Sequence, residues 1–140
     1  MTATDSLTPS EPTDSERALR RGARVMGTLR ALVGVAMIVA PRTVVRPKDG
    51  VAAAGDLVFM VRTIGVRDLA LGLGTLAAAS SSTSADPARW VRFGLVSDAL
   101  DVVTGMASAG LLGWGGAAGA ALIPAPFVAA DLWVLRTGRT

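Results

Sequence analysis

The stretch LVFMVRTIGVRDLALGLGTLAAA, residues 57–79, decides the fold of this chain. Most of it is apolar, and its 23 residues would rise roughly 34 Å as an α-helix, which is enough to cross a bilayer with slight tilt. We therefore predict a membrane-spanning helix over 57–79. The same stretch also carries Arg62, Arg67 and Asp68, which contact with lipid alone does not explain.

The composition of the whole chain also favours lipid as its main solvent. Of 140 residues, 51% are apolar, and the mean hydropathy of +0.48 is high for a soluble domain of this size. The sequence pI of about 11 is typical of nucleic-acid-binding proteins, but aromatic residues make up only 4% and the basic residues flank apolar segments. We therefore expect membrane lipid, and not nucleic acid, as a partner.

Cysteine and histidine are both absent from the sequence. Their absence excludes thiol catalysis, disulfides and imidazole bases and removes nearly all structural zinc chemistry, so any proton chemistry must rest on carboxylates. We expect no cofactor and no metal. Lysine occurs once, as Lys48, against thirteen arginines, which with abundant alanine and glycine indicates a GC-rich bacterial genome.

Three further apolar stretches accompany residues 57–79, and together they predict an all-α integral membrane bundle of four transmembrane helices. A polar segment, 1–21, precedes this membrane domain (22–136) and is expected to be a disordered tail, and 137–140 form a short C-terminal tail. Residues 113–116 are expected to form the turn before the last span. The predicted spans are about 25–45, 57–79, 88–112 and 117–135.

Arginines at both ends of the membrane domain predict its orientation. Four of them precede the first span and two follow the last. Because cytoplasmic segments carry an excess of basic residues, we expect both termini to lie in the cytoplasm, with the protein in the inner membrane of a bacterium. These arginines are Arg17, Arg20, Arg21, Arg24, Arg136 and Arg139.

Charged residues inside the predicted spans need a physical explanation, because each costs roughly 2.5 to 3.5 kcal/mol near the bilayer centre on insertion scales. Three cations and three anions are involved, so the interior is neutral if they meet. Asp98 and Asp101 share one face of their helix, and Asp68 and Asp98 should lie at similar depth in an antiparallel hairpin. The candidate polar network is Arg30, Arg62, Arg67, Asp68, Ser97, Asp98 and Asp101.

Two interpretations of this network stay open. It is either an ion-pair network that fixes helix order and register, or a proton, ion or small-molecule site at mid-membrane. A further carboxylate, Asp131, lies near the end of the last span, and we expect it to pair with an interfacial arginine. Gly65, Gly72 and Gly74 give the span over 57–79 a smooth side for close helix packing.

The segment GVRDLALG, residues 65–72, followed by a helix with Ser97, Asp98 and Asp101, resembles an uncharacterised family of small bacterial and fungal four-helix membrane proteins. It is also loosely similar to the DoxX-like four-helix proteins. The resemblance covers about residues 22–136 and implies the four-helix fold, but it implies no activity. The positions on which the polar centre of the family would fall are Arg67, Asp68, Asp98 and Asp101.

The leading hypothesis from the sequence is a non-enzymatic membrane subunit or assembly partner. Four short helices enclose little volume, and no set of residues specifies a reaction. A homo-oligomer or a larger membrane complex is the expected context. The alternatives are a small transporter or proton-linked permease that uses the Asp and Arg residues at mid-membrane, and a membrane enzyme in which an aspartic acid protonates a lipophilic substrate.

Overall fold

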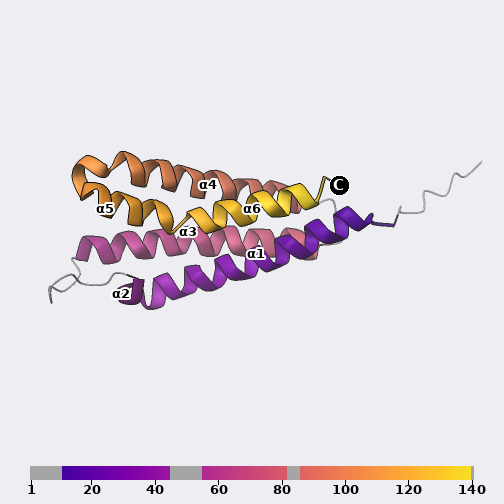
Figure 1. The fold of residues 1–140 in the computed structure, drawn as a ribbon. Helices are drawn as coiled ribbons and strands as arrows, with labels where there is room; N and C mark the ends of the chain where they lie inside the picture. The colour runs from indigo at the N-terminus through magenta and orange to yellow at the C-terminus, as the bar shows by residue number, and fades with distance from the viewer. Residues whose placement is uncertain (1–10, 45–54, 82–85, 140) are drawn as a thin grey trace, which may run out of the picture.

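The computed structural model describes residues 11–44, 55–81 and 86–139, and the secondary structure of these residues is entirely α-helical (Figure 1). The prediction of an all-α fold is confirmed for this part of the chain. The long helices run side by side (Figure 1). The helices are α1 (Asp14–Val39), α2 (Pro41–Val44), α3 (Gly55–Ser80), α4 (Pro87–Ala107), α5 (Ala109–Leu122) and α6 (Ala125–Thr137).

Helix α1 begins earlier than the sequence predicted. The hydroxyl of Thr13 accepts a hydrogen bond from the backbone N–H of Glu16 at 3.2 Å, and the Glu16 carboxylate accepts one from the backbone N–H of Thr13 at 2.9 Å. This reciprocal capping box starts the helix in polar sequence, where hydrophobic periodicity gives no signal. Residues 14–21, which we expected to belong to the tail, are therefore helical, whereas 1–10 lie outside the described residues.

Two arginines of α1 bind the last carbonyl groups of α3. Arg20 donates hydrogen bonds to the carbonyl oxygens of Ala78 and Ser81, at 3.5 and 2.9 Å, and Arg24 donates two to that of Ala79, at 3.1 and 3.3 Å. The last carbonyls of a helix have no partner within the helix. The first half of α1 therefore completes the C-terminal end of α3.

The last part of the chain is more broken than the predicted span over 117–135. Helix α4 ends at Ala107 and not at 112, and Ser108 separates it from α5. Within α5 the backbone leaves helical geometry at Gly113, with φ 69° and ψ 163°, and Pro124 precedes α6. Glycine and proline interrupt the helix at these two points because one adopts a conformation open to few other residues and the other lacks a backbone N–H.

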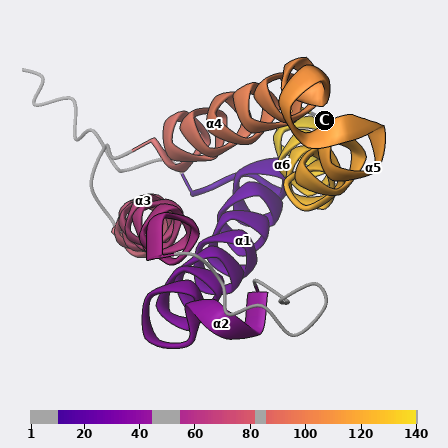
Figure 2. The same cartoon turned by 90° about the vertical axis from the view of Figure 1, so that its left-hand side faces the viewer.

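The helices group into two halves. Helix α1 lies along α3, whereas α4 lies along α5 and α6. In the end-on view of Figure 2, α1 lies between α3 on one side and α6 on the other. Helix α1 also contacts α4 and α6. Within the described ranges, α5 contacts α4 and α6 but neither α1 nor α3. The two halves are consequently joined mainly where α1 and α3 meet α4 and α6.

Glycines bring α1 and α3 into backbone contact. A Cβ atom on Gly34 would lie 2.6 Å from the carbonyl oxygen of Gly65, and one on Gly72 would lie 2.7 Å from that of Gly27. Each pair of glycines on one helix is seven residues apart, which keeps both on the same face. Of the glycines predicted to form a smooth side, Gly65 and Gly72 therefore pack against α1, whereas Gly74 packs against Trp90 of α4.

The surface of the bundle is rich in large apolar side chains, although a small apolar cluster that includes Met26, Val91 and Val134 is buried. Large apolar side chains lie on the surface along every long helix; Leu111 is 91% exposed and Val39 is 74% exposed. The buried set includes Arg30, Asp98 and Asp131 together with many small residues. Two helical segments, Asp14–Val39 and Ala109–Thr137, are long and apolar enough to cross a membrane. Charged side chains interrupt α3 and α4, which are of comparable length.

Candidate functional site

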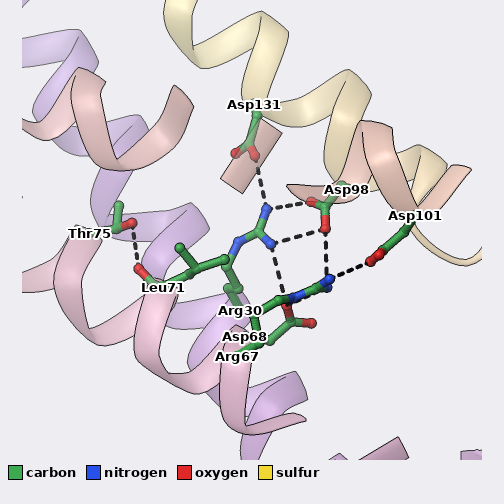
Figure 3. A network of polar contacts seen from close by, with 8 residues as sticks. All are labelled: Arg30, Arg67, Asp68, Leu71, Thr75, Asp98, Asp101 and Asp131. Carbon is green, nitrogen blue, oxygen red and sulfur yellow. Dashed lines mark hydrogen bonds and ion pairs between the residues drawn. The ribbon is translucent and has the colours of Figure 1, made fainter. Parts of the chain in front are cut away.

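A buried arginine on α1 forms the centre of the polar network (Figure 3). Arg30 is only 2% exposed, and its guanidinium donates hydrogen bonds to both carboxylate oxygens of Asp98, at 3.2 and 2.6 Å. It donates another to Asp131 at 2.9 Å, and its Nη1 lies 3.6 Å from the nearer oxygen of Asp68. Its Cζ lies 5.2 Å from the ring centroid of Phe127. Arginine suits this position because its planar fork binds a carboxylate with two parallel hydrogen bonds.

A second arginine, Arg67 on α3, extends the network toward the surface of the bundle. Its Nε and Nη2 donate to one oxygen of Asp68 at 3.2 and 3.0 Å, and its Nη1 lies 2.7 Å from a carboxylate oxygen of Asp101. Its Nη2 lies 3.7 Å from Asp98, which connects the two arginines through a shared carboxylate. The side chains of Arg67 and Asp101 are 31% and 36% exposed, so this end of the network is open.

The network joins four helices at about the middle of their lengths. Arg30 comes from α1, Arg67 and Asp68 from α3, Asp98 and Asp101 from α4, and Asp131 from α6 (Figure 3). It therefore bridges the two halves of the fold. A shift of any of these helices along its axis would separate the charges.

Asp131 was misplaced by the sequence analysis. We expected it to pair with an interfacial arginine, but it is 1% exposed and pairs with Arg30. The pairing of Asp131 with Arg30 could have been expected from the distance of each residue to a flanking arginine. Asp131 lies five residues before Arg136, and Arg30 lies six residues after Arg24. Similar spacing from the same end of a helical bundle places two residues at similar positions along it.

Two residues of the candidate set lie outside the network. Arg62 is exposed and donates a hydrogen bond from Nε to the carbonyl oxygen of Ile38 at 3.2 Å. Ser97 is half-buried on α4, and no hydrogen bond joins it to the network residues within the described ranges. The other five candidates, Arg30, Arg67, Asp68, Asp98 and Asp101, lie together.

A glycine on α4 makes room for the centre of the network. A Cβ atom on Gly94 would lie 2.8 Å from Nη2 of Arg30 and 3.0 Å from a carboxylate oxygen of Asp131. Any larger residue here would displace a guanidinium that is fully enclosed by its partners. The position is one that sequence reasoning did not single out, because only the tertiary contact shows the need for glycine.

The network contains more negative than positive groups. It has two arginines and four aspartates, so its formal charge with every group ionised is 2 − 4 = −2, and the predicted balance of three against three is wrong. Every buried side-chain nitrogen and oxygen in the described residues has a hydrogen-bond partner. Among the same residues, no three carboxylates, including those of the network, are arranged so that they could hold a metal ion.

Comparison of the chain with profiles of protein families, with curated proteins and with solved structures gives no match. A functional argument must therefore start from the geometry. The network offers carboxylates and guanidinium groups that already bind one another. A surface hollow on α1, lined by Arg24, Val25, Thr28 and Leu29, contains none of the network residues.

Proposed function

We propose that the chain is a multi-pass membrane protein that acts as a non-enzymatic subunit or assembly partner. Its four spans are α1, α3, α4 and the combined segment α5–α6, and its N and C termini lie in the cytoplasm of a bacterium. We also propose membership of the small four-helix membrane family that the segment 65–72 resembles. Both proposals extend the finding that two helical segments are long and apolar enough to cross a membrane.

The main support for this proposal is the number of large apolar side chains that are exposed on the surface of the bundle. Large apolar side chains are exposed on all the long helices; Leu111 is 91% exposed and Phe59 is 71% exposed. Exposure of so many apolar side chains to water is unfavourable. Lipid solvates such a surface, and it also forces polar side chains to find partners inside the protein. The enclosed contacts of Arg30 with Asp98 and Asp131 meet that requirement.

The network itself favours a structural role over catalysis. Arg30 is enclosed by three carboxylates, and each of those carboxylates comes from a different helix. A catalytic acid or base needs access to a substrate, whereas groups that only position helices need mutual contact. We therefore assign the network the task of holding the two halves of the bundle in register.

Cysteine labelling tests the membrane topology directly, because the natural chain contains no cysteine. Single cysteines replace Glu11, Gly110 and Arg139, which are all exposed. We expect the chain to stay with the membrane after an alkaline carbonate wash. In intact bacterial cells, an impermeant maleimide should label Gly110→Cys, whereas Glu11→Cys and Arg139→Cys should react only after lysis. Recovery in the soluble fraction would refute the proposal, and labelling of all three positions from one side would refute the four-span topology.

The charge excess of the network favours a proton-linked permease as a second candidate. Four carboxylates against two guanidinium groups in a low-dielectric site attract protons or another cation. Proton flux into liposomes that contain the purified protein and an internal pH-sensitive dye separates the candidates. A scaffold gives no flux above that of empty liposomes. A permease gives flux that Asp98→Asn abolishes and that the matched change Asp56→Asn, at an exposed site outside the network, leaves intact.

A further inference from the structure

Helices α3 and α4 face each other along a seam that is closed at only one end. At the closed end the indole of Trp90 packs directly against Gly74. Seven residues away along α3, the ion pair between Arg67 and Asp101 bridges the two helices. Beyond that pair, Thr104 on the corresponding face of α4 is exposed. Ala70, between Gly74 and the ion pair, is also exposed, so the seam is closed at Gly74 and open on both sides of the ion pair.

The side chains along the open seam are small or charged. Thr63, Arg67 and Ala70 share one face of α3, and Asp101 and Thr104 share one face of α4, by their spacing of three and four residues. Thr63, Ala70 and Thr104 are exposed. We define these five residues as the α3–α4 seam. Small residues of this kind allow the backbones of membrane helices to approach closely.

The ion pair in the seam is only partly covered by its own chain. The side chains of Arg67 and Asp101 are 31% and 36% exposed. Arg67 lies twelve residues from the first residue of α3, Gly55, or roughly 18 Å along the helix, which is too far for its side chain to reach the headgroup region. Hydrocarbon chains do not solvate such groups, so a polar surface must cover them in the membrane.

We propose that a second copy of this chain covers the α3–α4 seam in a two-fold symmetric dimer. The seam presents a cation beside an anion, and a two-fold rotation places Arg67 of each copy next to Asp101 of the other. The pattern is thus complementary to itself, and the small threonines and Ala70 allow the two surfaces to approach. This inference rests on the proposed membrane function, because in water the same ion pair would be solvated without a partner.

Crosslinking through single cysteines tests the interface in the full chain. Thr63→Cys and Thr104→Cys place a thiol in the seam, and Leu32→Cys places one on the exposed face of α1 as a matched control. The variants are oxidised in native membranes after a carbonate wash has shown that they are inserted. We expect covalent dimers from both seam variants and monomers from Leu32→Cys. Equal crosslinking at all three sites, or none in chains that are inserted, would overturn the proposal.

A charge variant tests whether the ion pair drives association. Asp101→Asn should weaken dimerisation in lipid vesicles roughly tenfold, measured by energy transfer between labelled copies on dilution, because it removes the anion that each copy offers to the other. Asp56→Asn, an exposed carboxylate outside the seam, should leave the dissociation curve unchanged. An equal effect of the two variants would also overturn the proposal. Failure of the chain to insert into membranes would instead refute the proposed function, and the dimer with it.

Discussion

The two halves of the bundle are held together in different ways. In the α1–α3 half, four glycines bring the backbones into direct contact, and Arg20 and Arg24 bind the end of α3. In the α4–α6 half, α5 is bent at Gly113 and contacts only α4 and α6 within the described residues. One half is closely packed along its length, whereas the other is an irregular group of shorter helices.

This difference shows what the polar network contributes. In a membrane, the hydrophobic effect contributes little free energy to helix association, because lipid chains are as apolar as the side chains they contact. Close packing and polar contacts therefore decide which helices associate. The first half has its glycine contact, whereas its joint to the second half combines a buried apolar cluster, which includes Met26, Val91 and Val134, with the ion pairs around Arg30 and Arg67. We therefore expect changes in the network to separate the halves and changes in the glycines to loosen the first half.

The largest effect should come from Arg30→Leu. This change leaves Asp68, Asp98 and Asp131 buried without their shared cation, and breaking a buried ion pair in this way costs about 3 to 5 kcal/mol. We expect the variant to accumulate poorly in membranes and to be cleaved faster by protease in mild detergent than the natural chain. Arg62→Leu removes an arginine outside the network and is the matched control. Equal accumulation of both variants would contradict the role given to the network.

Next in size should be Gly72→Ala, which tests the first half alone. The added methyl group would lie 2.6 Å from the backbone nitrogen of Ala31, so the helices must move apart, and overpacking of this kind costs about 1 to 3 kcal/mol. Gly119→Ala in the second half meets no atom within 4 Å and should be neutral or slightly stabilising. Unfolding curves in mixed detergent measure both. The comparison between halves fails if the two alanines have the same effect.

A smaller effect is expected for Gly113→Ala in the second half. With φ 69° and ψ 163°, Gly113 occupies a region that is essentially restricted to glycine, and alanine there costs about 1 kcal/mol or somewhat more. Gly110→Ala, three residues earlier in open space, is the control. Thermal unfolding in micelles should show a lower midpoint only for Gly113→Ala. A similar midpoint for both would mean that the bend is not needed for folding.

The smallest effect should come from Asp131→Asn. The amide oxygen still accepts a hydrogen bond from Arg30, and the change removes one of the two excess negative charges of the network. Polar contacts between membrane helices contribute about 0.6 kcal/mol on average, so the unfolding free energy should fall by about that amount or less. Unfolding curves in mixed detergent compare this variant with Asp98→Asn. Because Asp98 binds Arg30 through two oxygens, Asp98→Asn should lower the unfolding free energy more than Asp131→Asn does.

The sequence predicted α3 most accurately and the ends of the bundle least accurately. The predicted span over 57–79 differs from Gly55–Ser80 by two residues at one end and one at the other, because polar segments bound the apolar stretch on both sides. The start of α1 was missed because a capping box, and not periodicity, begins it. The turn predicted over 113–116 was misplaced: the break after α4 falls at Ser108, and Gly113 alone among 113–116 leaves helical geometry, because apolar composition does not report where a backbone bends.

The network was predictable in part, and helical geometry explains the limit. Asp98 and Asp101 are three residues apart, which puts both on the side of α4 that meets the arginines. Arg62 is five residues from Arg67, so the two point roughly 140° apart and cannot enter the same cluster. The contribution of Asp131 depends on how α6 lies against α1, which spacing within one helix does not reveal.

The bonds from Arg20 and Arg24 to the end of α3 connect orientation with folding in the proposed topology. The same cations that hold the N terminus in the cytoplasm also bind the carbonyls where α3 returns to that side. An α3 that ended earlier would not bring its last carbonyl groups to these donors. In the proposed topology, the two arginines therefore link the orientation of α1 to the position of the end of α3.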